Sequence, residues 1–304
     1  PRIRVFHKEN GGLSDARNAG IDWVEANSDS QWLIFADSDD WVHPELLARL
    51  LDAATAFDLK ISVCGYQETE GADPAVLPED MRPCRWTPKQ FYMEHFVNAT
   101  VAWGKLYSRS CFRDIRYPVG KIHEDEFVTY RLLFAQEAIA VVPAPLYAYF
   151  INPKGIIRSA WSPKRFHAWE AYDKQLAYFT AMGDEELVKF RIRGYLDNAL
   201  ANLHAAEQAI QEIAEATKAL KDKNLGIKVD SREDSEKYEE GTVSEQKTKA
   251  GTKVKKHSTV HVVVSSALIG KEIIVPDVST FWKALRAIPC YPPTEKIWMI
   301  CRIS

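Results

Sequence analysis

One stretch constrains the chain more than any other: a short apolar run that ends in carboxylates, Trp32-Leu33-Ile34-Phe35-Ala36-Asp37-Ser38-Asp39-Asp40-Trp41. An apolar run of this length predicts a buried strand. A strand of an open α/β sheet can direct the side chains at its carboxyl end into a ligand-binding crevice. Neighbouring carboxylates repel one another unless a cation or a proton relieves the repulsion. The run therefore predicts a site for a hard divalent cation that is shared with substrate phosphates.

A second interpretation of the same residues is a surface turn, because Asp and Ser are common in turns and at helix N-caps. In that case Asp40 would cap the amphipathic helix expected after Pro44. For an isolated Asp-x-Asp this interpretation would be favoured, since short motifs have many false matches. The segment that precedes the strand decides between the two.

That segment is His7-Lys8-Glu9-Asn10-Gly11-Gly12-Leu13-Ser14-Asp15-Ala16-Arg17-Asn18-Ala19-Gly20. It predicts a strand over Ile3–Phe6, a glycine-containing turn, a helix with Ala-Arg-Asn, and then the acidic strand end. This order resembles family 2 glycosyltransferases, the inverting enzymes of the GT-A fold, from Pro1 to about Tyr178. The resemblance implies a Rossmann-type mixed α/β sheet and transfer of a sugar from a nucleotide-diphosphate sugar.

The same resemblance implies the residues of the donor site. Its donor-binding positions match Asn10, Gly11, Arg17, Asp37 and Ser38, and its metal positions match Asp39 and Asp37, with Mn²⁺ or Mg²⁺ as the cofactor. Gly11 and its neighbour allow positive φ and close backbone approach to a ligand. The guanidinium of Arg17 could pair with a diphosphate, because it matches phosphate oxygens as a fork. A structural salt bridge with Asp15 or Asp37 is the open alternative.

A second acidic motif, Glu124-Asp125, lies in Lys121-Ile122-His123-Glu124-Asp125-Glu126-Phe127. The resembling family has a Glu-Asp pair here, at the start of a helix on the acceptor side. Asp125 matches the general base, which takes the proton of the attacking acceptor hydroxyl, and Glu124 matches its support. A helix N-terminus would stabilise the anionic carboxylate. The alternative is an ordinary acidic first turn of a helix.

Two further residues resemble the W-x-K-L-Y segment of members of the family that build polysaccharides. Trp103 offers a flat apolar face for a sugar ring, and Lys105 could meet phosphate or hydroxyl groups. The resemblance implies that both bind the acceptor. A core tryptophan beside a surface lysine is the open alternative.

The chain enters the resemblance at a strand, without the βαβ unit that precedes it in the family. That unit carries the acidic residues that hold uracil and ribose. We expect either a truncated chain or a natural remnant, with an N-terminally incomplete sheet.

The C-terminal third changes in composition. Residues from about 213 to 278 resemble a PASTA repeat, with Ala250-Gly251-Thr252 and the alternating run Thr259–Ser265. PASTA modules act outside the cell, whereas family 2 catalytic domains usually face the cytosol. The predicted domains are a catalytic domain at 1–160, a helical extension at 161–220, a charged PASTA-like β segment or linker at 221–278, and amphipathic helices at 279–304. The last of these could contact the membrane face or pack on the domain.

Composition excludes several classes. The net charge is −3, so no overall field favours nucleic acid. The cysteines are five in number without C-x-x-C spacing, which argues against a disulfide framework or a zinc site and fits a reducing compartment. No apolar run approaches the roughly 18 residues of a membrane span. We therefore expect a cytoplasmic protein, peripheral at the inner membrane face if the C-terminal helices bind lipid.

The sequence thus predicts a glycosyltransferase that uses a UDP-linked donor and a saccharide or lipid-linked acceptor in bacterial surface polysaccharide synthesis. Two alternatives stay open. One is a non-catalytic transferase remnant that carries a PASTA-like, muropeptide-binding module. The other is a nucleotidyltransferase, which explains Asp-x-Asp but does not explain Ala16-Arg17-Asn18 together with Glu124-Asp125.

Overall fold

The computed structural model describes residues 4–71, 77, 80–151, 163–222, 226–234, 243–246, 259–266 and 297–301. The chain divides into two compact units. The larger unit consists of Gly11–Asn152, Phe166–Arg193 and Ile273–Ser304. The smaller unit consists of Pro1–Asn10, Pro153–Arg165 and Gly194–Glu272.

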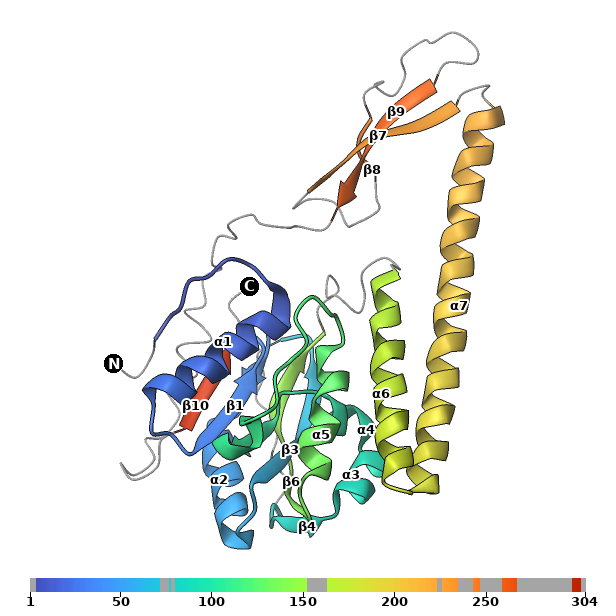
Figure 1. Cartoon of the computed structure of the whole chain (residues 1–304). Helices are drawn as coiled ribbons and strands as arrows, with labels where there is room; N and C mark the ends of the chain where they lie inside the picture. The colour runs from blue at the N-terminus through green and yellow to red at the C-terminus, as the bar shows by residue number, and fades with distance from the viewer. Residues whose placement is uncertain are drawn as a thin grey trace. The chain divides into compact units, whose positions relative to one another are not determined.

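The larger unit is built on a mixed sheet with the strand order β10-β1-β5-β3-β6-β2, in which β4 also pairs with β6 (Figure 1). β3 runs parallel to β6, and β1 runs parallel to β10, whereas the other pairs are antiparallel. The strands are β1 (Trp32–Ala36), β2 (Trp41–Val42), β3 (Ile61–Thr69), β4 (Cys84–Trp86), β5 (Lys105–Ser108), β6 (Ile139–Phe150) and β10 (Ile297–Cys301).

The apolar run Trp32–Ala36 forms β1, and both of its faces are covered. Leu33 and Phe35 belong to one hydrophobic cluster, whereas Ile34 and Ala36 belong to another. A strand with two buried faces needs apolar side chains at every position, which explains why the run does not alternate. The carboxylates of Asp37 and Asp39 follow directly after this buried strand.

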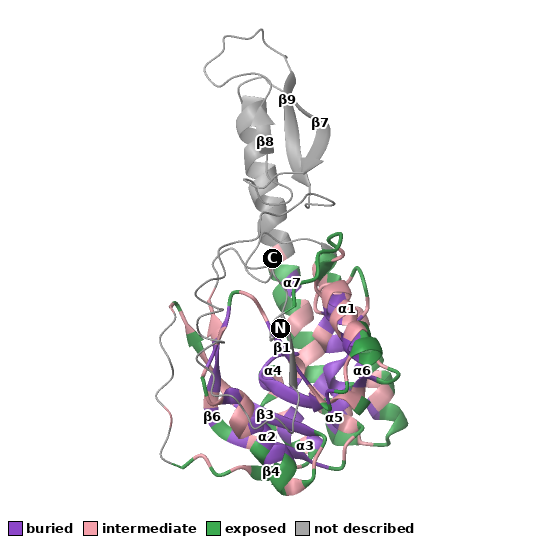
Figure 2. Cartoon of the chain, turned by 90° about the vertical axis from the view of Figure 1, so that its left-hand side faces the viewer, coloured by how far each residue is buried: buried purple, intermediate pink, exposed green. Residues whose placement is uncertain are grey.

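Helices of the larger unit contribute residues to both clusters. The helices of the described residues are α1 (Gly12–Asn27), α2 (Leu46–Phe57), α3 (Pro88–Glu94), α4 (Phe96–Thr100), α5 (Thr129–Phe134), α6 (His167–Ala181) and α7 (Glu185–Asp222), with 3-10 helices η1 (Arg109–Phe112), η2 (Glu124–Phe127) and η3 (Pro163–Phe166). Ile21 of α1 packs in the cluster of Phe35, and Leu50 of α2 packs in the cluster of Ile34. Figure 2 shows buried residues along the strands of the larger unit and along parts of its helices.

The smaller unit contains a three-stranded sheet in the order β7-β9-β8, formed by β7 (Gly226–Asp234), β9 (Thr259–Ser266) and β8 (Val243–Gln246). β7 is parallel to β9, and β8 is antiparallel to it. The strand predicted over Thr259–Ser265 is therefore confirmed. The predicted fold class, an α/β protein with a mixed Rossmann-type sheet and a small second segment, is confirmed as well.

Two predictions about the chain's ends are wrong within the described residues. The strand predicted over Ile3–Phe6 does not form at residues 4–6, and Val5 and Phe6 are about half exposed there. Helices were predicted at 279–304, but 297–301 form β10, which pairs with the edge of β1. A strand satisfies the backbone groups of that edge, which a helix cannot do. Residues 279–296 lie outside the described part.

Among the described residues, no helix combines the length and apolarity that crossing a membrane requires. The predicted contact of the C-terminal segment with a membrane face stays a prediction. The predicted domain boundaries at 160, 220 and 278 likewise stay predictions.

Candidate active site

Residues of β6 hold the turn after β1 in place through hydrogen bonds. The Tyr147 hydroxyl donates to Asp40 Oδ2 at 2.6 Å and accepts from the Asp37 N–H at 3.0 Å. The Phe150 N–H donates to Asp40 Oδ1 at 2.8 Å. Burial raises the pKa of Asp40 to about 8, against the opposing effect of these two hydrogen bonds. Asp40 therefore holds the turn in place.

The surface-turn interpretation predicted that Asp40 caps the next helix, and this prediction is wrong. The N-cap of α2 is Glu45, and α2 begins only at Leu46. The carboxylates of Asp37 and Asp39 face the surface to different degrees: Asp39 is exposed, and 27% of the Asp37 side chain is accessible. Ser38 lies between them in the turn. The turn thus buries its last aspartate and leaves the first two accessible.

Arg17 connects this turn to the second acidic motif. α1 turns Ser14, Arg17, Ile21 and Val24 inward at helical spacing. The Nη2 atom of Arg17 lies 3.1 Å from Asp37 Oδ1, and its Nη1 atom donates to Glu124 Oε1. Its guanidinium also lies over the Tyr117 ring, 5.3 Å from the centroid. Of the two alternatives for Arg17, the structure displays the ion pair with Asp37 and adds Glu124 as a partner.

The Glu124-Asp125 pair lies on η2, next to Arg17. Glu124 is buried and paired, and Asp125 Oδ1 accepts from the N–H of Glu126 at 3.0 Å. Burial, followed by the negative charge of Glu124, raises the pKa of Asp125, and Arg17 opposes this rise. The pKa of Asp37 is also raised, because burial outweighs the effect of Arg17. The two acidic motifs predicted from the sequence therefore lie at one site.

The local structure at Glu124-Asp125 differs from the predicted helix start. His123 has a positive φ of 58°, η2 is a four-residue 3-10 helix, and the α-helix α5 begins only at Thr129. A 3-10 helix this short has few aligned peptide dipoles, so the expected stabilisation by a helix N-terminus does not apply. Arg17 provides the positive charge instead.

The turn before α1 leaves no room for a side chain at Gly11. This residue precedes the first turn of α1, and a Cβ there would overlap the Asp15 carboxylate. Gly12 has a φ of +85°. Asn10 is exposed in the segment before the helix. The donor-binding roles of Asn10 and Gly11 stay predictions.

Trp103 and Lys105 lie in the interior. The Trp103 ring stacks on Tyr147 with centroids 4.4 Å apart and an interplanar angle of 8°. The Lys105 ammonium donates to the carbonyls of Val101 at 2.7 Å and Trp103 at 3.2 Å, and the residue is fully buried. The open alternative predicted a core tryptophan beside a surface lysine. Trp103 lies in the core as that alternative predicts, whereas Lys105 is buried and not at the surface. Both side chains are buried in this conformation. Their contact with an acceptor stays a prediction.

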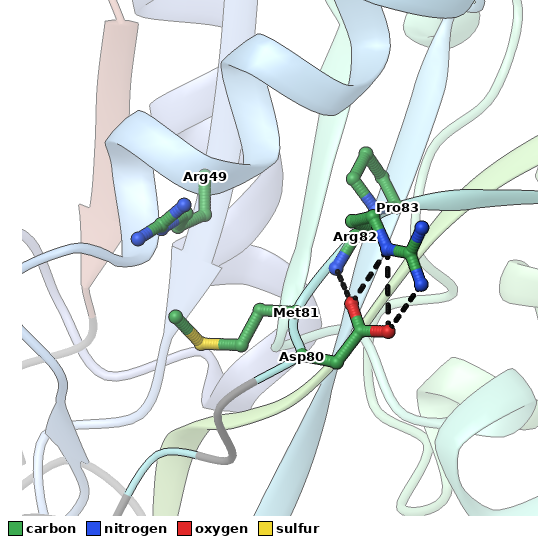
Figure 3. A pocket seen from close by; sticks show the side chains of 5 residues that line it. All are labelled: Arg49, Asp80, Met81, Arg82 and Pro83. Atoms are coloured by element: carbon green, nitrogen blue, oxygen red, sulfur yellow. Dashed lines mark hydrogen bonds and ion pairs between the residues drawn. The ribbon is translucent and has the colours of Figure 1, made fainter.

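A surface hollow lies elsewhere, between α2 and the segment that leads into β4 (Figure 3). Asp80 accepts from Arg82 there at 2.7–3.2 Å, and Arg49 and Met81 flank this exposed pair. None of the residues that line it is one of the predicted site residues. We therefore assign the hollow no part in the chemistry.

Three residues of this region were not predicted from the sequence. Tyr147 fixes the Asp37–Asp40 turn, and Gln175 and Arg191 lie behind Glu126. Tyr147 stands in a continuous apolar run, and the other two stand in helices whose pattern indicates only a packed face. No local signal distinguishes them from ordinary core residues.

Two segments of the chain match known protein families. Residues 1–116 match the model of glycosyl transferase family 2, and residues 211–266 match the PASTA domain. The chain is 27% identical over 229 residues to glycosyltransferase GlyA of Streptococcus pneumoniae serotype 4, covering 67% of this chain and 31% of the relative. It is 27% identical over 232 residues to the uncharacterized glycosyltransferase EpsJ of Bacillus subtilis, covering 70% of this chain and 65% of that one.

The chain thus spans 31% and 65% of the lengths of these two relatives. Among solved structures, S. aureus TarS 1–349 in complex with UDP-GlcNAc is 17% identical with a TM-score of 0.42, covering 53% of this chain and 45% of that chain. Both resemblances seen in the sequence are confirmed: the chain carries a family 2 glycosyl transferase domain, matched at residues 1–116, and a PASTA domain, matched at residues 211–266.

Proposed function

We propose that the chain is an inverting glycosyltransferase. It would move a sugar from a UDP-linked donor onto a saccharide or lipid-linked acceptor in bacterial surface polysaccharide synthesis. The observation that carries the proposal is the double contact of Arg17 with Asp37 and Glu124, which joins the two acidic motifs in one place. The match to family 2 and the glycosyltransferase relatives support it.

In this proposal Asp125 is the general base. The acceptor hydroxyl oxygen attacks the anomeric carbon while its proton passes to the Asp125 carboxylate. The bond between the anomeric carbon and the diphosphate oxygen breaks, and UDP leaves with the electron pair. Attack on the face opposite the leaving group inverts the anomeric configuration. A pKa raised by burial and by Glu124 makes Asp125 a stronger proton acceptor than an ordinary aspartate.

The turn after β1 fits a hard divalent cation. Asp37 and Asp39 offer accessible carboxylate oxygens from one turn. Among the described residues, no group of three or more His, Cys, Asp or Glu side chains gathers into a metal site. Two protein carboxylates suit a Mg²⁺- or Mn²⁺-type ion, which usually shares its remaining ligand positions with substrate phosphates and water. Family 2 enzymes generally use a divalent metal ion, which here would neutralise the charge that develops on the leaving diphosphate.

The proposal is tested by calorimetric titration of UDP into the full chain, with and without Mn²⁺. Metal-dependent binding of UDP is expected. A panel of UDP-sugars would then be tested for hydrolysis and transfer. Absence of UDP binding at millimolar nucleotide, with or without Mn²⁺, in a chain that is folded by circular dichroism would overturn the assignment of a donor site.

The PASTA match favours a second candidate function, which is binding of a muropeptide by residues 211–266. This function requires neither Asp125 nor a nucleotide. Titration of a muropeptide into the chain and into its Asp125→Asn variant separates the two candidates. Equal muropeptide affinity in both, without UDP binding in either, would favour a binding protein over a transferase.

A further inference from the structure

The segment that carries Asp125 packs against α6 at several successive points. The Lys121 ammonium pairs with Glu170 Oε2 at 2.6 Å, and the Ile122 N–H donates to His167 Nδ1 at 3.2 Å. His167, Glu170 and Gln175 all belong to α6, so three positions of this helix contact the segment from Lys121 to Glu126.

Gln175 makes the most specific of these contacts. It is 1% exposed, and its Nε2 atom donates to the Glu126 carbonyl at 2.7 Å and to Glu126 Oε2 at 2.8 Å. Its Oε1 atom accepts from the Tyr92 hydroxyl at 2.7 Å and from Arg191 Nη1 at 3.3 Å. Both donors and both acceptor positions of the amide are therefore used. If the amide were rotated by 180°, its NH₂ group would face the donors of Tyr92 and Arg191, so these groups fix its orientation.

Arg191, from the first turns of α7, completes the arrangement behind Glu126. It is 2% exposed, and its guanidinium lies 4.0 Å from the centroid of the Tyr172 ring and 4.8 Å from that of Phe96. Its positive charge opposes the effect of burial on Glu126, whose pKa is raised. A buried glutamate on the turn thus has a cation and an amide on its inner side.

Asp125 stands between two neighbours that are held by two different helices. Arg17 of α1 binds Glu124, and Gln175 of α6 binds both the side chain and the carbonyl of Glu126. Without these partners, three adjacent carboxylates would repel one another and the short 3-10 turn would lose its shape. We propose that α6 clamps the turn that carries Asp125, and that Gln175 is the positioning residue through which it acts. This inference rests on the proposed function, in which Asp125 is the base.

The first test measures the turn without reference to activity. Hydrogen–deuterium exchange of a peptide that covers residues 121–128 is compared between the wild-type chain and Gln175→Met, which keeps the side-chain length and removes all four hydrogen bonds. Exchange in this peptide is expected to rise at least tenfold. Phe179→Leu, on the same helix but without a polar contact to η2, is the control. Its exchange in this peptide should stay within twofold of wild type at a similarly lowered melting temperature.

An equal rise in both variants, or no rise in Gln175→Met, would overturn the proposal. If Gln175→Met does not fold, Gln175→Glu provides the same comparison. It keeps the acceptor for Tyr92 and Arg191 and places a carboxylate against Glu126, so exchange of the turn should rise in this variant too.

The second test uses hydrolysis of UDP-glucose, UDP-galactose and UDP-N-acetylglucosamine, with the donor that is turned over fastest. Gln175→Met should lower kcat at least tenfold and leave the affinity for UDP within twofold. In a Glu126→Met background the same change should have little further effect, because Gln175 acts through Glu126. Independent, additive losses would contradict the positioning role.

The Asp125→Asn variant separates this proposal from the proposed function. It should lose turnover while the peptide 121–128 keeps its slow exchange. Full turnover in Asp125→Asn would reject the proposed base, whereas the exchange comparison would still report whether α6 holds the turn.

Discussion

Arg17 and Glu124 form an ion pair in the interior although 107 residues separate them in the chain. Each side chain is 6% exposed, and the same guanidinium also contacts Asp37. The contact requires α1, the end of β1 and η2 to be assembled together. The two acidic motifs can therefore act at one site only in the folded protein, and a single cation holds both.

Arg17→Met should destabilise the fold strongly, because it leaves two partly or fully buried carboxylates without their cation. Removal of one partner of a buried ion pair costs about 3–5 kcal/mol. Urea denaturation at neutral pH would measure the free energy of unfolding. Arg17→Lys should lose less, since it keeps the charge and loses only the two-pronged geometry.

Arg49→Met is the control for Arg17. Arg49 pairs with Glu45 at 2.7 Å, one helical turn away, and its side chain is 41% exposed. A pair of this kind that is open to solvent contributes about 0–1 kcal/mol, so this variant should unfold close to wild type. Equal losses in the two variants would show that burial of the Arg17 pair does not decide its contribution.

Much of the larger unit could be predicted because its signals are local. The apolar run at Trp32–Ala36 forms β1 as expected, and the leucine-rich segment after Pro44 forms α2. The family resemblance placed Asp37 and the Glu124-Asp125 pair at one site, and the structure brings them together through Arg17. Residue spacing and composition predict an element when its structure depends mainly on residues close to it in the sequence.

The parts that failed depend on distant partners. The segment Ile297–Cys301 is apolar throughout, so its periodicity does not distinguish a helix from a strand, and its pairing with the edge of β1 makes it a strand. Lysine is rarely fully buried, yet two backbone carbonyls hold the ammonium of Lys105 inside. Gln175 and Arg191 matter because of their place beside Glu126, which lies about 50 to 65 residues earlier in the chain. No local pattern carries such information.

Lys105 should make stability depend on pH. Burial lowers its pKa from 10.5 to about 7, against the opposing effects of Cys64 and Asp125. Between these two values the unfolded chain binds one proton more than the folded chain at this residue. The free energy of unfolding therefore gains a contribution that rises as the pH increases from about 7 toward 10.5, on the order of 1 kcal/mol per pH unit.

The comparison of wild type with Lys105→Met isolates that contribution. Methionine fills a similar volume and does not titrate, so the rise should be missing from the variant. Urea unfolding at intervals between pH 6.5 and 9.5 gives both curves. Parallel curves for the two proteins would show that Lys105 stays protonated throughout this range.

Asp39→Ala should remove the metal dependence of UDP binding without loss of stability, because Asp39 is exposed in the turn after β1. Calorimetric titration of UDP at fixed Mn²⁺ would measure the effect, and the affinity is expected to fall at least tenfold. Asp173→Ala, an exposed position on α6, is the control and should bind like wild type. Unchanged Mn²⁺ dependence in Asp39→Ala would reject the assignment of this residue as a metal ligand.

Asp125→Asn should abolish transfer and spare donor binding. The amide has nearly the shape of the carboxyl group but cannot accept the proton, and loss of a positioned general base costs about 10²–10⁴ in rate. Burial and the charge of Glu124 raise the pKa of Asp125 above its usual 3.8, and the base acts only when it is unprotonated. Wild-type kcat should therefore fall as the pH decreases through that raised pKa, well above pH 4. Measurement of kcat between pH 5 and 9, together with UDP affinity at each pH, checks both statements. A flat profile, or wild-type turnover in Asp125→Asn, would assign the proton transfer to another residue and leave Arg17 and Gln175 as structural supports of the turn.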